Sequence, residues 1–121
     1  MPASTVFVAG SRQISQLPGE VRARLDTMIE KGFRILVGDA NGADKAVQRY
    51  LAHKAYPNVL VYCMKDRCRN NVGNWPMREV AAPRGANGFD YYSLKDRAMA
   101  EAAEYGLMLW TARVRARPTT S

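Results

Sequence analysis

A glycine-bearing turn near the middle of the chain has the residue types of a small-molecule site. It reads Gly38-Asp39-Ala40-Asn41-Gly42-Ala43-Asp44 and follows the apolar run 33–37. Glycine can adopt positive φ or let a ligand approach the backbone, and a turn between a buried strand and a helix gathers N–H groups around an anion. Five residues of the turn are predicted to bind a ligand: Gly38, Asp39, Asn41, Gly42 and Asp44.

The two carboxylates of this turn suit different tasks. Asp39 directly follows the apolar run, and we expect it to accept hydrogen bonds from a ribose hydroxyl or a base amine, with an Asx turn as the alternative. Asp44 stands where a helix begins, so capping of that helix is an alternative to ligand binding. The turn matches neither the dinucleotide-binding GxGxxG pattern nor the P-loop pattern.

A second turn of this kind follows the first apolar segment of the chain. Gly10, Ser11 and Arg12 combine close backbone approach, a hydroxyl donor and a guanidinium fork. That combination suits a phosphate or a carboxylate. An ordinary turn with a surface arginine is the alternative.

The elements that position these turns alternate between strand and helix. Apolar runs predict strands over 5–9, 34–37, 59–64 and 106–110, and apolar stripes predict helices over 17–31, 43–55 and 93–104. This alternation predicts an α/β fold, a Rossmann-like three-layer sandwich with a parallel sheet of about four strands in the order 3-2-1-4. Both glycine turns should then open at the carboxyl edge of the sheet, where such folds bind ligands.

Two cations are predicted to balance the charge of a bound phosphate. Lys95 and Arg97 fall in the first turn of the helix expected over 93–104, which a capping box at Ser93 to Asp96 would open. Cations at a helix N-terminus oppose the macrodipole. A bound anion would relieve that conflict, whereas a solvated face of mixed charge is the alternative.

The segment 65–92 has no clear periodicity and is expected to be a long loop. It carries Arg67, Arg69, Arg78 and Arg84 together with Trp75 and Phe89. Such residues suit a basic and aromatic surface for nucleic acid, or a lid over a small ligand.

Length, composition and charge limit the kind of protein that this sequence can encode. A chain of 121 residues with 47% apolar content is expected to form one domain over 1–110, followed by a basic, flexible tail over 111–121. The net charge of +7 suits an anionic partner. The apolar runs are too short for a membrane span. Cys63 and Cys68 match no zinc pattern and fit a reducing compartment, so we expect a cytoplasmic protein without metal or cofactor.

The chain resembles the SLOG superfamily, a Rossmann-like group that includes the cytokinin-activating LOG phosphoribohydrolases and the DprA/Smf proteins. The resemblance runs from about Thr5 to Trp110. It rests on Ala9-Gly10-Ser11-Arg12, on the turn 38–44, on Cys68-Arg69-Asn70-Asn71-Val72-Gly73-Asn74-Trp75, and on 95–99 and 105–110. It is most specific for a small stand-alone bacterial branch of mostly uncharacterised proteins. The resemblance implies nucleotide or nucleotide-derived ligands along these turns.

The chain departs from the family pattern after the last predicted strand. LOG enzymes carry there a Pro-Gly-Gly-x-Gly-Thr motif and a glutamate needed for hydrolysis. In this sequence no glycine follows Trp110 and no acidic residue follows Glu104. An enzyme of this type would need Asp39 or Asp44 in place of that glutamate.

The sequence thus predicts a protein that binds a nucleotide or related phosphorylated ligand at Gly10, Ser11, Arg12, the turn residues, Lys95 and Arg97. A nucleotide N-glycosidase is the first alternative, and nucleic-acid binding through the basic loop and tail is the second. Apolar surface near residues 107–110 predicts a homodimer or larger assembly.

Overall fold

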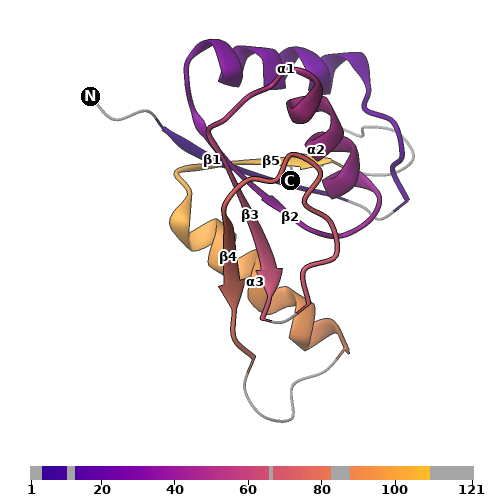
Figure 1. The fold of residues 1–121 in the computed structure, drawn as a ribbon, viewed down its shortest axis with the longest axis vertical. Helices are drawn as coiled ribbons and strands as arrows, with labels where there is room; N and C mark the ends of the chain where they lie inside the picture. Colours follow the sequence, from indigo (N-terminus) through magenta and orange to yellow (C-terminus); the bar gives the residue numbers. More distant parts are fainter. Residues whose placement is uncertain (1–3, 11–12, 66, 83–87, 110–121) are drawn as a thin grey trace, which may run out of the picture.

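The computed structural model describes residues 4–10, 13–65, 67–82 and 88–109. Within them a five-stranded, all-parallel sheet forms the centre of the molecule, with α1 and α2 at the top of Figure 1 and α3 below them. The strands are β1 (Thr5–Gly10), β2 (Arg34–Gly38), β3 (Val59–Met64), β4 (Met77–Val80) and β5 (Tyr105–Leu109). The helices are α1 (Gly19–Glu30), α2 (Ala43–His53) and α3 (Gly88–Ala102).

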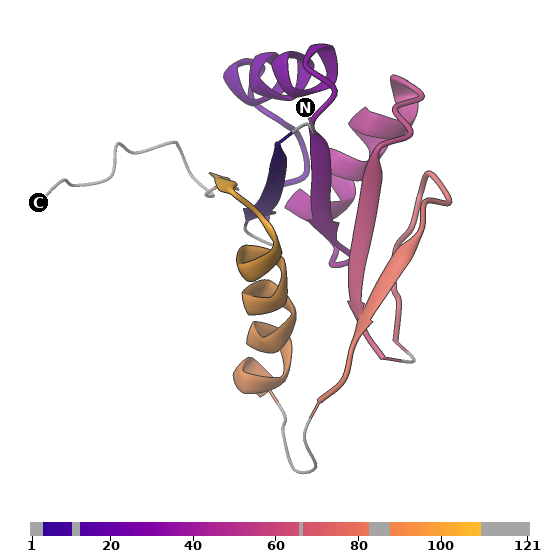
Figure 2. The same cartoon turned by 90° about the vertical axis from the view of Figure 1, so that its left-hand side faces the viewer.

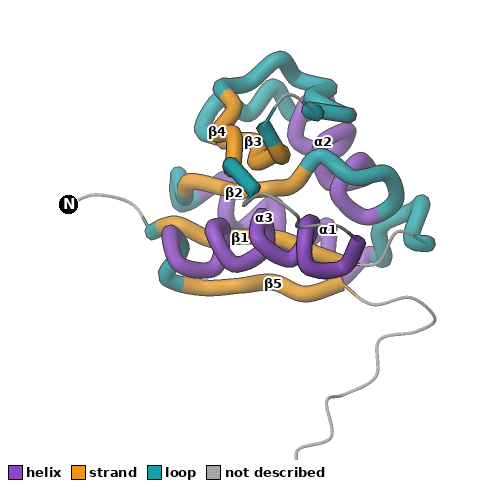
Figure 3. The backbone as a smooth tube through the Cα atoms, turned by 90° about the horizontal axis from the view of Figure 1, so that it is seen from below, coloured by secondary structure: helices purple, strands orange, loops and turns teal. Residues whose placement is uncertain are grey.

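The predicted α/β class is confirmed, and the strand count is corrected from four to five. The sheet order is β4-β3-β2-β1-β5, which keeps the predicted order for the four expected strands and adds β4 beside β3 (Figure 3). The segment 65–92 is therefore not one long loop. The sequence did not predict β4, because this strand has only four residues, three of them exposed, and therefore lacks an apolar run.

The helices cover both faces of the sheet. Side chains alternate between faces along a strand, and Ile35, Val37, Val59 and Val61 share one buried cluster with residues of α1 and α2. The intervening Leu36, Leu60 and Tyr62 instead share a second cluster with Met99 of α3. This arrangement is the expected three-layer sandwich. β4 and β5 lie at its two borders (Figure 2).

The third helix begins earlier than predicted. It starts at Gly88, not at Ser93, so the expected capping box does not mark its N-terminus. Lys95 is consequently in the middle of a 15-residue helix. Among the described residues, no helix combines the length and apolarity needed to cross a membrane.

Candidate ligand site at the carboxyl edge of the sheet

Gly10 and Gly38, the first residues of the two glycine turns, lie at the same edge of the sheet, as predicted. β1 ends at Gly10 and β2 ends at Gly38, and the two strands are parallel neighbours. Trp110, the last residue of the final predicted strand, lies outside the described residues. A cavity of about 90 Å³ lies here, lined by Ala9, Gly10, Ala40, Asp44, Arg69, Lys95 and Asp96.

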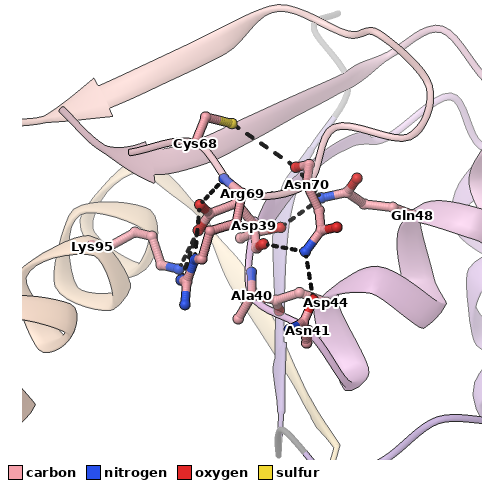
Figure 4. Close-up of polar contacts among 10 residues, drawn as sticks. Asp39, Ala40, Asn41, Asp44, Gln48, Cys68, Arg69, Asn70 and Lys95 are labelled. Carbon is pink, nitrogen blue, oxygen red and sulfur yellow. Dashed lines mark hydrogen bonds and ion pairs between the residues drawn. The ribbon is translucent and has the colours of Figure 1, made fainter. Parts of the chain in front are cut away.

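A buried carboxylate, Asp39, joins the cations of this edge (Figure 4). Its side chain is 1% exposed, and its Oδ1 accepts hydrogen bonds from Lys95 Nζ at 2.8 Å and from Arg69 Nη2 at 3.1 Å. Its Oδ2 accepts from the backbone N–H of Arg69 at 2.8 Å and from Arg69 Nε at 3.3 Å. Protein donors therefore already occupy both oxygens that were predicted to receive a ribose or a base.

The charge state of Asp39 follows from these contacts. Burial acts to raise the pKa of this carboxyl, but the hydrogen bonds from Arg69 and Lys95 outweigh it and hold the pKa below its usual value. Asp39 is thus an anion that fixes Arg69 and Lys95, each of which comes from a different part of the chain.

Asp44, unlike Asp39, lines the cavity itself. The N-cap of α2 is Gly42, with φ 82°, and Asp44 makes no capping bond to α2; its Oδ2 accepts from the N–H of Ala40 at 3.1 Å. Burial raises the pKa of Asp44 to about 6, against the opposing effects of Lys95 and of the bond from Ala40. Asp44 therefore changes its charge close to neutral pH.

The glycines of the site are required mainly by close packing. A Cβ on Gly38 would clash with Asp44 Oδ2 and lie 3.2 Å from Lys95 Nζ. A Cβ on Gly10 would lie 2.5 Å from the carbonyl oxygen of Leu109, in the neighbouring strand. Both positions need glycine before any ligand is considered.

A polar network that the sequence analysis missed supports the same edge. Gln48, fully buried on α2, donates to the carbonyl oxygens of Gly38 at 2.8 Å and Asn70 at 3.1 Å, and accepts from the N–H of Val72 at 2.8 Å. Asn70 donates to the Asp39 carbonyl at 2.8 Å and to Asn41 Oδ1 at 3.0 Å. One feature of the sequence could have indicated this network: the polar Gln48 lies beside Val47 and Leu51 on the apolar stripe of the predicted helix.

Lys95 and Arg97 do not lie at a helix N-terminus, as the sequence predicted, because α3 begins at Gly88. Lys95 is 3% exposed and is neutralised by Asp39, so a bound anion is not needed to explain it. Lys95 does line the cavity, whereas Arg97 is exposed on α3 and lies outside the cavity lining. Partial burial raises the pKa of the neighbouring Asp96, with Lys95 opposing the shift.

The remaining predicted residues have mixed outcomes. Asn41 is exposed and bonded to Asn70, while Ser11 and Arg12 lie outside the described residues. Trp75 is buried in the core, and its Nε1 donates to the Tyr56 carbonyl at 2.8 Å, so it offers no exposed face for stacking on a base. Trp75 therefore does not contribute to the basic and aromatic surface predicted over 65–92.

Comparison of the chain with protein-family models, with curated proteins and with solved structures finds no match.

Proposed function

We propose that this protein binds a nucleotide, or a phosphorylated ligand derived from one, at the carboxyl edge of the sheet. The cavity beside the ends of β1 and β2 carries the proposal. Open α/β sheets bind ligands beyond the carboxyl ends of their strands, at the point where the strand order reverses. Here that reversal falls between β1 and β5. Membership of the SLOG superfamily is part of this proposal.

The size of the cavity suits one part of such a ligand. Drug-sized ligands occupy roughly 300–1,000 Å³, whereas this cavity measures about 90 Å³. A sugar or the polar edge of a base would fill it. The rest of the ligand would extend along the edge of the sheet.

The charges of the lining favour the sugar or the base over the phosphate. Lys95 and Arg69 line the cavity but are both paired with Asp39, and Asp44 and Asp96 add two further carboxyl groups to the lining, so carboxyl groups outnumber the cations. A phosphate would meet two carboxylates here, whereas hydroxyl and amine groups find both donors and acceptors. We therefore assign the sugar or base to Asp44, Asp96 and Lys95.

The phosphate is assigned to the turn after β1. Gly10 lines the cavity and leads directly into Ser11 and Arg12. A hydroxyl and a guanidinium next to a glycine provide charge-assisted hydrogen bonds to phosphate oxygens. The N-terminus of α2, at Ala43, adds a positive helix end at the same edge of the sheet.

Calorimetric titration tests whether the phosphate and the sugar or base bind at the residues proposed for each. Wild-type protein should bind nucleoside monophosphates more tightly than the matching nucleosides or inorganic phosphate. Arg12→Ala should weaken nucleotide binding by roughly 1.5–3 kcal/mol, the range for a hydrogen bond to a charged group. Arg97→Ala is the matched control and should bind as wild type does. Equal binding by Arg12→Ala and wild type would refute the phosphate assignment.

One observation favours a nucleotide N-glycosidase as the second candidate. Asp44 combines a position on the cavity with a pKa of about 6, which suits a general acid at neutral pH. Asp39 is unsuited to this task because Arg69 and Lys95 keep it ionised. Release of free base from nucleoside monophosphates should then disappear in Asp44→Asn while binding persists. Base release by that variant at the wild-type rate would exclude Asp44 as the acid.

A further inference from the structure

The fifth strand leaves one border of the sheet open. β5 lies at the end of the strand order and, among the described strands, pairs only with β1 (Figure 3). Its side chains Tyr105 and Met108 are large, apolar and exposed. An edge strand of this kind is a template on which another strand can pair. The border of β5 is therefore a surface that one further strand can extend.

A groove lies beside this border, between β5 and α1. Its volume is about 260 Å³, and apolar residues of both elements line most of it, among them Val21, Leu107 and Leu109. The two charged residues of this lining are Glu20 and Arg24, which are exposed on α1 one helical turn apart. Within the part of the chain that the structure describes, neither has an ion-pair partner. The groove thus carries one charge of each sign on an apolar surface.

We propose that two copies of this chain pair their β5 strands in antiparallel orientation across a twofold axis, which joins two five-stranded sheets into one continuous sheet. Charge complementarity selects a second copy as the occupant of this border. A twofold interface brings the same patch of both subunits together. A patch with one acid and one base complements itself, because each charge then meets its opposite. The inference does not depend on the ligand proposed above.

The twofold axis stands perpendicular to the sheet. This orientation makes the two edge strands antiparallel and keeps α1 of both copies on the same face of the joined sheet. The two α1 helices then run in opposite directions on that face. Glu20 of one copy therefore faces Arg24 of the other, and the same contact occurs a second time on the other side of the axis.

The faces of the β5 side chains determine the register. Leu107 packs against the core cluster that includes residues of α1, so the next residue, Met108, points to the opposite face of the sheet. Directly opposed residues of an antiparallel pair lie on the same face. The twofold axis must therefore pass through a residue of β5, and Leu107 is the centre of this five-residue strand.

This register covers the exposed side chains of β5. Met108 of one copy lies opposite Gly106 of the other, and Tyr105 lies opposite Leu109. Glycine has no side chain, so Gly106 leaves room for the long side chain of Met108. Each of the two exposed apolar residues is thus covered by the strand of the second copy.

Charge reversal at the groove tests the proposal by sedimentation velocity. Glu20→Arg and Arg24→Glu each place like charges opposite one another at both symmetric contacts. Each variant should raise the dissociation constant of the dimer roughly tenfold, because attraction becomes repulsion twice. Glu30→Arg, the same substitution at the other end of α1, is the matched control and should dimerise as wild type does. Circular dichroism checks that the exposed substitutions leave the fold intact.

Mixing the two reversed variants tests the contact between copies. A dimer of one Glu20→Arg chain and one Arg24→Glu chain has opposite charges at both contacts, so the mixture should recover nearly wild-type affinity. A mixture that stays monomeric would overturn the contact between Glu20 and Arg24. Unchanged dissociation constants in both variants, or a wild type that is monomeric at micromolar concentration, would overturn the proposed dimer.

Hydrogen exchange of the wild-type protein gives a second test that needs no variant. Strand pairing protects backbone N–H groups, so the amides of β5 should exchange more slowly at a concentration where the dimer forms than in dilute monomer. The amides of β4, at the opposite border of the sheet, should exchange equally in both. Exchange at β5 that does not change with concentration would overturn the pairing of β5.

Discussion

The ammonium group of Lys95 lies 2.8 Å from Oδ1 of Asp39, although 56 residues separate the two along the chain. Lys95 belongs to α3, on one face of the sheet, and Asp39 follows the end of β2. Both side chains are almost fully buried. The pair therefore fixes α3 to the carboxyl edge of the sheet, and Arg69 joins the segment after β3 to the same carboxylate.

Asp39→Asn should destabilise the fold strongly. The substitution leaves the buried ammonium of Lys95 without its counter-charge, and breaking a buried ion pair from one side costs about 3–5 kcal/mol. Urea denaturation measures the loss. Asp26→Asn is the control, since Asp26 and Lys54 form an exposed pair with N–O 3.6 Å, and such pairs contribute at most about 1 kcal/mol. Similar losses in both variants would contradict the role of Asp39.

Asp44 should make the free energy of unfolding depend on pH between about 4 and 6. Its folded pKa of about 6 lies above 3.8, the ordinary value for an aspartate, so the folded state binds the proton more tightly than the unfolded state does. The resulting stability is complete below about pH 4 and is lost as the pH rises through 6. Since one pKa unit corresponds to 1.36 kcal/mol, a difference of about two units changes the free energy of unfolding by about 3 kcal/mol.

Asp44→Asn should remove this dependence, because asparagine carries no charge and can still accept from the N–H of Ala40. The variant should match wild type at pH 4 and become the more stable protein as the pH rises to 7. Denaturant titrations of both proteins across this range provide the measurement. A stability difference that stays constant with pH would show that Asp44 ionises normally. The lowered pKa of Asp39 has the opposite sign: its stabilising effect is present above the usual titration range of an aspartate and is lost as the pH falls through that range toward the lower folded pKa.

Gly38→Ala should cost about 1–3 kcal/mol, the range for overpacking. The new methyl group would meet Asp44 Oδ2 and Lys95 Nζ, which are fixed by their own partners. Gly19→Ala is the matched control, because its nearest neighbour is the flexible Arg22 Nη2 at 3.7 Å and alanine favours the helix. Thermal or urea unfolding should show a lower stability for Gly38→Ala than for Gly19→Ala. Equal stability would mean that Gly38 is not packed as described.

The β5 border of the sheet is expected to form a homodimer interface. Tyr105 is 60% exposed and Met108 45% exposed on this edge strand. Unpaired strand edges with apolar side chains favour association. Light scattering should show a dimer for wild type and a monomer for Met108→Lys. Met77→Lys, at a 50% exposed residue of the opposite edge strand, should remain dimeric. A monomeric wild type at micromolar concentration would refute the assembly.

The sequence predicted the fold better than the site. Continuous apolar runs and helical stripes identified four of the strands and all three helices, since burial on both faces leaves a strong local pattern. β4 leaves little pattern because Met77, Arg78 and Glu79 are exposed. The start of α3 was misplaced because Ser93-Leu94-Lys95-Asp96 resembles a capping box within the helix.

The contacts of the site are non-local, which limits what sequence reasoning can predict. The turn 38–44 was found from its glycines and carboxylates. That Arg69 and Lys95 converge on Asp39 depends on pairings over 30 and 56 residues, which leave no periodic signal. For the same reason the sequence favoured Asp39 as a ligand group, whereas the structure places Asp44 on the cavity.

Nuclear magnetic resonance of isotope-labelled protein, titrated with a nucleoside monophosphate, tests the central claim most directly. We expect the amide signals of four residues that line one cavity at the carboxyl edge to shift together and saturate: Gly10, Ala40, Asp44 and Asp96. Signals of Arg49 and Tyr50, which line a separate hollow beside α1 and α2, should stay in place. No shifts at millimolar nucleotide, or shifts confined to Arg49 and Tyr50, would contradict the proposed site.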